Sequence, residues 1–363
     1  MIDIKHSVVS EEMAKAVFET LSSGRLAGTG TIIEEYERGL AEEFGSRFAV
    51  ACSSGTTAVS LAILASGIPS GSTVAVPSIV PTMTPLAVIG AGCIPHFVDI
   101  GSPETVGVSF DQIKALALAG KIQAVVAVAM WGYPSSEAEL AELCEDLGIV
   151  LIEDASHAHM ATLGSRKLGT YGRVGAFSTH ERKLLFTGEG GFCLTDDETV
   201  AVRLRALREF GRLGKNGTFA ESSGYNFKLA SPLAALGHVQ VRSLEKRIAD
   251  RQVVWGSLYE LARQSKQVSP IELPSNSRPS TYGFLALAAE RETAARLQND
   301  LEAIGVLSDT KKYNHRPVYE IGIFKDHAKE DCKHSRDFCE RAIALPAHEG
   351  VSAIILDKIG SVI

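Results

Sequence analysis

Short apolar segments alternate with amphipathic segments through the first two thirds of the chain. The apolar segments are rich in valine and isoleucine and are short enough to be buried β-strands. The predicted strands are FAVAC (48–52), TVAVP (73–77), HFVDI (96–100), QAVVAVAM (123–130), IVLIED (149–154), VGAFST (174–179) and GFCLTD (191–196).

Amphipathic segments between these strands predict helices, among them TTAVSLAILAS (56–66) and SSEAELAELCEDLG (135–148). The second opens with serines and acidic residues, which suit the N-terminus of a helix. Continuous apolar strands separated by helices indicate an α/β fold with a mostly parallel sheet covered on both faces. In such sheets ligands bind beyond the carboxyl ends of the strands.

The pattern changes after Asn226. A long helical stretch covers 231–264, and a shorter α+β section follows. Its predicted elements are a strand at 281–289, a helix at 292–305, and closing helices around 335–343 and 351–362. A chain of 363 residues exceeds the usual size of a single core. We therefore predict a large α/β domain over residues 1–240 and a small α+β domain over 241–363.

Composition and charge narrow the functional classes. The chain is 45% hydrophobic, as in ordinary globular proteins, and its net charge of −7 offers no basic surface for nucleic acid. The amino terminus carries acidic residues where a signal peptide is basic, and the apolar run at 122–131 is about half of a membrane-spanning length. We expect a cytoplasmic protein with no nucleic-acid or membrane partner.

The six cysteines are scattered and lie mostly in apolar patterns, which indicates reduced, buried thiols. One cluster, His327, Cys332, His334 and Cys339, has the ligand types of a zinc site. Its spacings match no standard zinc motif, so no metal is predicted.

Candidate chemistry lies at the ends of the predicted strands. In SSGTTA (53–58), small residues lead from a strand into a helix, where backbone N–H groups and hydroxyls could cradle a phosphate. A serine-rich helix cap is the alternative. GYNFKLASPLAALG (224–237) indicates by itself only a turn followed by a helix.

The strand end LIEDASHAH (151–159) carries two adjacent carboxylates, Glu153 and Asp154. Successive side chains of a strand point to opposite faces, so only one of them should enter a given pocket. An aspartate here could hold a cationic ring nitrogen protonated, and His157 could donate a hydrogen bond to a phenolate-like oxygen. Alternatively, His157 and His159 are structural histidines at the strand exit.

The segment FSTHERKLLFTGEGG (177–191) contains Lys183. Arg182 precedes it and three apolar residues follow it, and both features favour a lowered pKa and a free, nucleophilic amine. The alternative is an ordinary solvated lysine.

Together these stretches supply a phosphate cradle, an acid for a ring nitrogen, a donor for a ring oxygen and a lysine amine. Pyridoxal phosphate needs this set, because it is held through a Schiff-base lysine, an anchored phosphate and a protonated pyridine.

Several segments also resemble the DegT/StrS-type sugar aminotransferases, which are fold-type I pyridoxal phosphate enzymes. They are GRLAGTGTIIEEYERGLAEEFG, SSGTTAVSLAI, VPSIVPTMTPLAVIGAGCIPHFVDI, IEDASHAHMA, FSTHERKLLFTGEGG, GYNFKLASPLAALGHVQV and the closing ALPAHEGVS (344–352). The resemblance implies a Schiff base at Lys183 and a phosphate site at Gly55, Thr56 and Ser178.

By the same resemblance, Asp154 partners the pyridine nitrogen and His157 approaches the ring hydroxyl. Asn226 matches an asparagine that reaches the phosphate of the neighbouring subunit's cofactor, which implies a homodimer with shared active sites.

The implied function is transfer of an amino group from an amino acid, L-glutamate in the family, to a keto sugar or related polyhydroxylated ketone. Pyridoxamine phosphate carries the group between the two half-reactions. The implied setting is amino-sugar, surface-polysaccharide or natural-product biosynthesis.

Three alternatives differ from this function. Related dehydratases have histidine in place of the lysine, so Lys183 argues against a dehydratase or lyase. A pyridoxal phosphate-binding regulator or partner protein without turnover would keep the same site. A nicotinamide oxidoreductase is suggested by the turn GTG (28–30), but no predicted strand leads into it.

Three positions depart from the family pattern. Pro81 stands where an aromatic residue or histidine stacks on the pyridine, and Lys228 where arginine is common. Met160 replaces a glycine beside the cofactor and is expected to narrow the pocket. These differences concern the substrate, so the sequence does not predict which ketone is aminated.

Overall fold

The computed structural model describes residues 1–214, 216–329 and 331–363. Its centre is a seven-stranded sheet with the order β1-β11-β10-β7-β6-β2-β3. The strands are β1 (Phe48–Cys52), β2 (Thr73–Pro77), β3 (Ile94–Val98), β6 (Ala124–Val128), β7 (Val150–Asp154), β10 (Val174–Ser178) and β11 (Gly191–Thr195). All seven predicted strands are confirmed, although β3 begins two residues earlier than expected. Neighbouring strands are parallel except around β11, which pairs antiparallel with β1 and β10.

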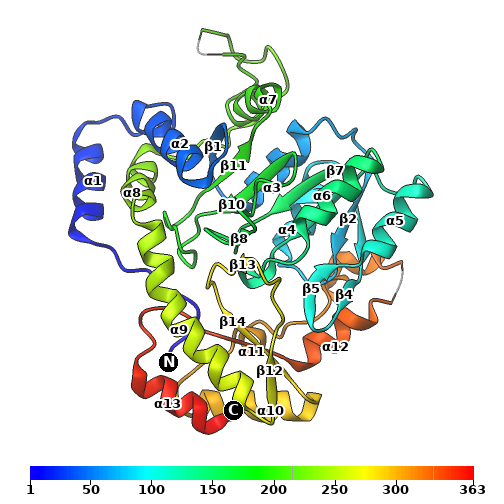
Figure 1. Cartoon of the computed structure of the whole chain (residues 1–363). Helices are drawn as coiled ribbons and strands as arrows, with labels where there is room; N and C mark the ends of the chain where they lie inside the picture. The colour runs from blue at the N-terminus through cyan, green and yellow to red at the C-terminus, as the bar shows by residue number, and fades with distance from the viewer. Residues whose placement is uncertain (215, 330) are drawn as a thin grey trace.

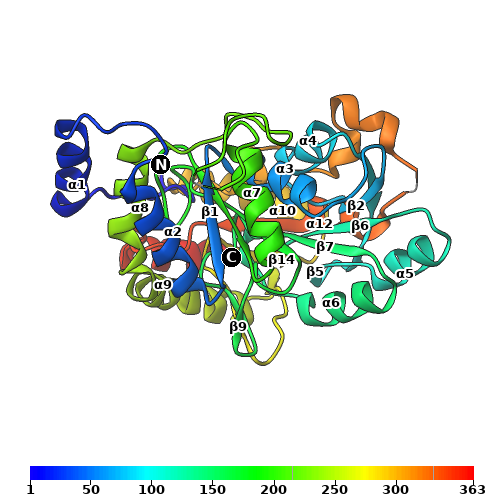
Figure 2. The same cartoon turned by 90° about the horizontal axis from the view of Figure 1, so that it is seen from above.

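Helices cover both faces of this sheet (Figures 1 and 2). They are α2 (Thr31–Phe44), α3 (Gly55–Ala65), α4 (Met83–Gly90), α5 (Phe110–Leu118), α6 (Glu137–Asp146), α7 (Glu198–Arg208) and α8 (Ser231–Val241). Each strand serves two cores because its side chains alternate: Val50 packs in the cluster beneath α3, and Ala49 and Ala51 pack beneath α2.

The two predicted helix starts differ in their caps. Ser54 precedes α3 and its Oγ accepts a hydrogen bond from the Thr57 N–H at 3.1 Å. Ser136 precedes α6 but makes no side-chain cap, so the expected serine cap is wrong there. The Glu137 carboxylate instead accepts from the Ser135 N–H at 2.9 Å.

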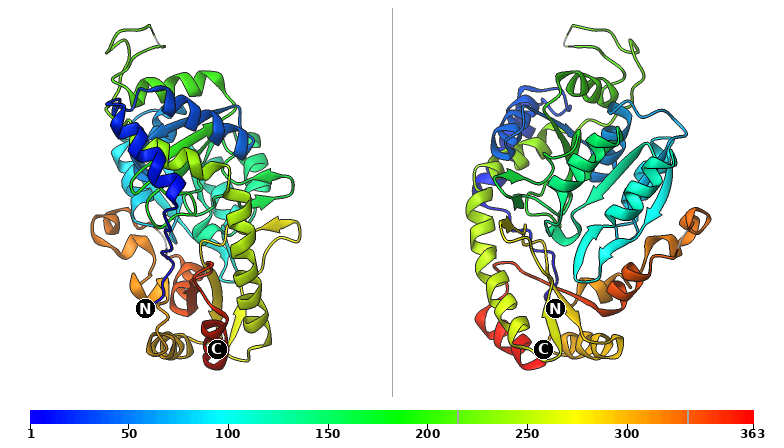
Figure 3. Two further views of the ribbon diagram at one scale, coloured as in Figure 1. Left: turned by 90° about the vertical axis from the view of Figure 1, so that its left-hand side faces the viewer. Right: turned by 45° about the vertical axis from the view of Figure 1, so that its right-hand side comes forward.

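The predicted helix over 231–264 is two helices, α8 and α9 (Leu244–Gln264), because the chain turns at Arg242 and Ser243. Helix α8 packs on α1 (Glu11–Ser22) and α2, whereas α9 runs down to the smaller body (Figures 1 and 3). We propose that the domain boundary lies here, near residue 240.

The smaller body contains a three-stranded antiparallel sheet, β12-β14-β15, and both chain termini (Figure 1). Its elements are β12 (Val268–Pro270), β14 (Phe284–Ala288), β15 (Ala342–Leu345), α10 (Arg291–Ala303), α12 (Lys333–Arg341) and α13 (Ala353–Val362). The predicted helix over 335–343 therefore ends earlier, and its last positions begin β15. Ile2 forms a bridge with Val306, so the first residues of the chain belong to this body.

Shorter elements complete the fold. They are α11 (Asp309–Lys312), β4 (Ile100–Ser102), β5 (Thr105–Val108), β8 (Thr162–Leu163), β9 (Arg166–Lys167), β13 (Ser277–Arg278) and the 3-10 turns η1 (Met130–Gly132), η2 (Val318–Glu320) and η3 (Gly322–His327). In the described part of the chain, no helix combines the length and apolar character needed to cross a bilayer.

All six cysteines are buried, as their apolar surroundings predict. Within the described residues, the cluster considered for zinc brings no three potential ligands together. Cys339 instead contacts the His315 ring, with Sγ 3.5 Å from Nδ1.

Candidate active site

A cavity of about 560 Å³ lies at the carboxyl ends of the parallel strands, between the sheet and the smaller body. Six of the predicted site residues line it: Gly55, Thr56, Asp154, His157, Ser178 and Lys183. The smaller body contributes Tyr282, Asp309, Tyr313 and His315. The sequence motifs thus meet in one place, as the edge of a parallel sheet predicts.

The predicted phosphate cradle lies where α3 begins beside the end of β10. Because Ser54 caps Thr57, the helix-terminal N–H groups of Gly55 and Thr56 lie at the cavity wall. A Cβ atom at Gly55 would lie 2.5 Å from the Ser178 Cβ and 2.9 Å from its Oγ. Only glycine lets the helix terminus and the serine hydroxyl approach this closely. The serine cap is therefore present in SSGTTA, and the close approach of Gly55 and Ser178 leaves the predicted cradle possible beside it.

Gly55→Ala should block this cradle. The added methyl must push α3 away from Ser178, which costs about 1–3 kcal/mol as overpacking, and should weaken pyridoxal phosphate binding at least ~10-fold. Thermal unfolding of the apoprotein and a cofactor titration measure the two effects. Gly256→Ala is the control, because a Cβ there meets nothing within 4 Å. Unchanged cofactor affinity in Gly55→Ala would contradict the assignment of the cradle.

The two carboxylates of β7 point to opposite faces, as predicted. Asp154 is buried, and its Oδ2 accepts from the Thr84 hydroxyl at 2.6 Å and its Oδ1 from the Ser156 N–H at 3.2 Å. The Glu153 carboxylate accepts hydrogen bonds from the backbone N–H groups of Gly169, Tyr171 and Gly172, each at 2.7 Å. Asp154 therefore faces the cavity, and Glu153 has a structural role on the other side of the sheet.

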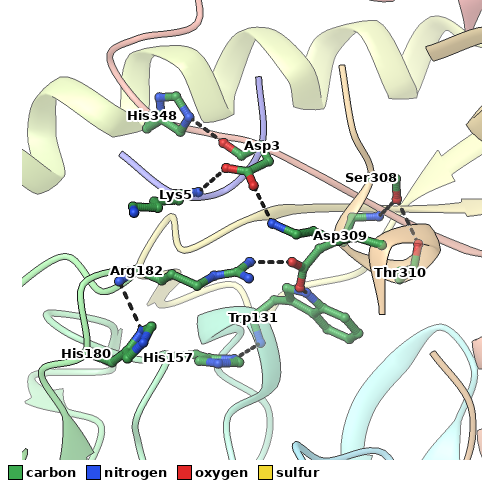
Figure 4. A network of polar contacts seen from close by, with 12 residues as sticks. Asp3, Lys5, Trp131, His157, His180, Arg182, Ser308, Asp309, Thr310 and His348 are labelled. Carbon is green, nitrogen blue, oxygen red and sulfur yellow. Dashed lines mark hydrogen bonds and ion pairs between the residues drawn. The ribbon is translucent and has the colours of Figure 1, made fainter. Parts of the chain in front are cut away.

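His157 is oriented by its neighbours. Its ring stacks on Tyr282 with centroids 4.0 Å apart, and its Nδ1 lies 3.2 Å from the Trp131 backbone N–H (Figure 4). A backbone N–H can only donate, so Nδ1 accepts and the neutral ring carries its proton on Nε2. Burial holds the pKa of His157 well below 6.5, which keeps the ring neutral. The Nε2–H is then a hydrogen-bond donor.

His159 has the structural role considered for both histidines. It is buried, and its ring contacts Phe44, Phe177 and Phe192, with the Phe177 centroid 5.5 Å away. It does not line the cavity. The two histidines of the motif therefore differ in role.

Lys183 is a buried amine, so the surface-lysine alternative is wrong. It is 8% exposed, and its Nζ lies 4.7 Å from the centre of the Tyr282 ring. Burial lowers its pKa to about 7, Asp154 opposes this shift, and Arg182 adds to it. A large share of the amine is consequently unprotonated near neutral pH.

Backbone hydrogen bonds join the two ends of the loop that carries Lys183. The N–H groups of Thr179 and Thr187 donate to Gly190 O at 2.8 Å and to Thr179 O at 2.7 Å. Gly190 has φ +153°, and a Cβ there would lie 2.4 Å from the Thr179 Oγ1. The glycine-rich turn is thus required by the close approach of the two threonines.

The departures from the family pattern lie in different surroundings. Pro81 lines the cavity beside Met83. Met160 is fully buried in the core with φ +63° and does not line the cavity, so the expected narrowing is wrong. Its left-handed backbone explains why glycine suits this position.

Asn226 does not line the cavity of its own protomer. It is exposed, and its Oδ1 accepts a hydrogen bond from Lys228. The Lys228 amine also lies 3.9 Å from the centre of the Phe210 ring.

The turn GTG leads from α1 into α2 and does not follow a strand. Gly28 has a packing reason, because a Cβ there would lie 2.2 Å from Leu229 O. The turn borders a second cavity of about 700 Å³ beside α2 and α7, whose described lining contains no lysine. The strand–turn–helix context of a dinucleotide site is therefore missing.

Several cavity residues carry no sequence motif. Arg182 reaches across to Asp309 of the smaller body, and Trp131 approaches the same carboxylate (Figure 4). Tyr282 lies between His157 and Lys183. The only signal for Arg182 in the sequence is its place before the lysine, and Tyr282 and Asp309 have none.

Comparison with known proteins places the chain in a family. Residues 8–363 match the model of the DegT/DnrJ/EryC1/StrS aminotransferase family. GDP-perosamine synthase of Caulobacter vibrioides is 28% identical over 347 residues, covering 94% of this chain and 92% of that protein. The spore coat polysaccharide biosynthesis protein SpsC of Bacillus subtilis is 32% identical over 368 residues, covering 97% and 93%.

A solved DegT DnrJ EryC1 StrS aminotransferase from Brucella abortus superposes with a TM-score of 0.88 at 26% identity, covering 97% of this chain and 94% of that one. This fold is the fold-type I architecture that the sequence predicts. With the family match over nearly its whole length, the chain belongs to the DegT/DnrJ/EryC1/StrS aminotransferase family and is a pyridoxal phosphate-dependent aminotransferase.

Proposed function

We propose that the protein transfers an amino group from an amino acid, with L-glutamate as the expected donor, to a keto sugar or related polyhydroxylated ketone. The proposed setting is amino-sugar, surface-polysaccharide or natural-product biosynthesis, as the names of its two relatives suggest. The buried Lys183 amine in the strand-end cavity, with its pKa lowered to about 7, carries this proposal.

The cavity residues fit pyridoxal phosphate group by group. The N–H groups of Gly55 and Thr56 and the Ser178 hydroxyl would hold the phosphate, in a cradle that a Cβ at Gly55 would fill. Asp154 would bind the protonated ring nitrogen, and the His157 Nε2–H would donate to the ring oxygen. When bound, the cofactor supplies an electron-accepting ring for the negative charge that develops at Cα of the amino acid.

The protein side chains hold the charges and move the proton. The Lys183 amine, whose pKa burial lowers to about 7, would anchor the cofactor and would become free when the amino group of the donor takes its place. Once free, its Nζ would take the proton from Cα of the donor and deliver it to the cofactor carbon that carries the amino group, within the same half-reaction. In the second half-reaction Nζ would move a proton in the opposite direction, onto the carbon of the acceptor that receives the amine. The buried Asp154 carboxylate, fixed by Thr84 and Ser156, keeps the ring nitrogen protonated throughout.

The homodimer is part of this proposal. Asn226 is exposed and lies outside its own cavity, in the segment between α7 and α8. An asparagine so placed is available to a second copy of the chain. We propose that it reaches the cofactor phosphate of the neighbouring subunit.

The test is a pair of half-reactions followed by the absorbance of the bound cofactor. L-Glutamate should convert the holoenzyme to the pyridoxamine phosphate form and release 2-oxoglutarate. A screen of free and nucleotide-linked keto sugars should then find one that restores the starting spectrum. A spectrum that no amino acid changes would refute transamination and favour a binding protein without turnover.

A further inference from the structure

Arg182 lies in the wall of the reaction cavity, one residue before the lysine. Its side chain is 13% exposed, and Nη2 lies 2.6 Å from the Asp309 Oδ1 (Figure 4). The guanidinium also lies over the Tyr313 ring, 4.9 Å from its centre. The mechanism described above uses none of these contacts.

The hydrogen-bonding capacity of Arg182 is only partly used. Arg182 Nε is buried and has no hydrogen-bond partner among the described residues. Asp309 contacts the guanidinium through one oxygen only, because its other oxygen accepts from the Trp131 Nε1–H at 3.2 Å. Arginine binds a carboxylate most strongly through two parallel N–H groups. The guanidinium thus keeps donors for a second anion.

Arg182 and the reacting amine share one neighbour, Tyr282. The Tyr282 ring lies beneath the Lys183 Nζ, and its hydroxyl interacts with the Arg182 side chain. The amine and the guanidinium therefore meet the same aromatic ring, one at its face and the other at its hydroxyl end. Arg182 and Lys183 also line the same cavity, so a donor whose Cα lies at Lys183 shares that cavity with the guanidinium.

Every amino acid donor carries such a group. Its α-carboxylate is bonded directly to Cα, whereas a keto sugar has neutral carbons next to its reacting carbonyl. An isolated anion in a cavity of this kind needs a cation with free donors, since its desolvation is otherwise costly.

Resting on the proposed transamination, we propose that Arg182 binds the α-carboxylate of the amino donor and that Asp309 positions the guanidinium for it. Arg182 then selects amino acids over neutral amines in the first half-reaction. It also binds the same carboxylate of the departing 2-oxo acid. Asp309 acts through Arg182 and does not touch the substrate.

The experiment measures the first half-reaction of the holoenzyme with L-glutamate and with its α-amide, in which the α-carboxylate is neutral. Wild type should favour L-glutamate strongly. Arg182→Gln should raise the Kd for L-glutamate about 10- to 100-fold and leave that for the α-amide nearly unchanged. Arg182→Lys should recover part of the preference, because lysine supplies the charge without the planar fork.

Asp309→Asn is the matched variant, because it removes the ion pair and keeps the cation. If Arg182 serves the donor, this variant should bind L-glutamate within about 3-fold of wild type, because the amide oxygen can still accept from the guanidinium and keep it in position, while the cation stays available to the carboxylate. If the ion pair only stabilises the packing of Asp309 against Arg182, Arg182→Gln and Asp309→Asn should raise the Kd by the same factor for L-glutamate and for its α-amide. That result would overturn the proposal.

L-Glutamine distinguishes the two carboxylates of L-glutamate, because it retains only the α-carboxylate. A loss in Arg182→Gln that affects L-glutamate but spares L-glutamine would assign Arg182 to the side-chain carboxylate and overturn the proposal. A wild-type holoenzyme that converts no amino acid would overturn the proposed function itself. Wild-type conversion together with an unaltered Kd in Arg182→Gln would overturn only the role of Arg182.

Discussion

Lys183→Ala is expected to abolish covalent attachment of pyridoxal phosphate and to lower kcat by about 10³-fold or more, because one side chain serves as anchor and proton carrier. Lys183 is buried in the cavity wall, and the other cavity residues supply the remaining cofactor contacts. Borohydride reduction followed by peptide mapping measures the attachment, and single-turnover kinetics measure the loss of rate.

A lysine outside the cavity provides the control for Lys183. Lys167 is half-buried and paired with Glu43 at 3.6 Å, so Lys167→Ala should retain the covalent label and the rate. Label on any residue other than Lys183, or unaltered turnover in Lys183→Ala, would contradict the catalytic assignment.

The lowered pKa of Lys183 also predicts how this residue changes the stability of the apoprotein with pH. In the folded apoprotein this pKa is about 7, against 10.5 for an ordinary lysine. Between these values the unfolded chain binds more protons, so the contribution of this group to stability rises with pH. Below pH 7 its buried charge carries the full penalty. The apoprotein of Lys183→Met should therefore gain most in Tm at low pH and least near pH 10.

Asp154→Asn is expected to lower kcat by about 10²- to 10³-fold, because an amide cannot hold the ring nitrogen protonated. The side chain keeps nearly the same shape and can still accept from the Thr84 hydroxyl. The Tm of the apoprotein should therefore change little while turnover falls. Steady-state kinetics and thermal unfolding of the same preparations separate the two effects.

The neighbouring carboxylate is a matched control for Asp154. Glu153→Gln weakens three buried hydrogen bonds that backbone N–H groups donate to this side chain on the opposite face of the sheet. It should cost about 1–3 kcal/mol of unfolding free energy and leave the kcat of the folded holoenzyme nearly intact. Equal losses of kcat in the two variants would show that Asp154 acts only through the fold.

The strands could be predicted because their residues are buried on both faces, and such runs have few alternatives. The shift of β3 shows what a local pattern misses. Asp99 lies within the expected strand. Its Oδ1 accepts two hydrogen bonds from Ser335, one from the backbone N–H at 2.8 Å and one from the side-chain hydroxyl at 2.6 Å. The strand ends there because a helix from the other end of the chain supplies these donors.

The candidate site likewise contains residues that sequence motifs predict and residues that they do not. Gly55, Asp154 and Lys183 sit in short motifs at strand ends, and the topology brings such ends together. Tyr282 and Asp309 arrive from the smaller body, and nothing in their immediate sequence indicates a cavity. For Met160, the family pattern predicts a pocket residue, but a left-handed backbone turns the side chain into the core.

The antiparallel strand β11 has a consequence for how the enzyme folds. It separates β1, which leads into Gly55, from β10, which ends at Ser178, so the two halves of the cradle meet only when three strands have paired. Pairings of this kind join distant parts of the chain and form slowly. In a refolding sample, the return of cofactor absorbance therefore reports the pairing of β1, β11 and β10, and a nascent chain cannot capture its cofactor before β11 has been synthesised.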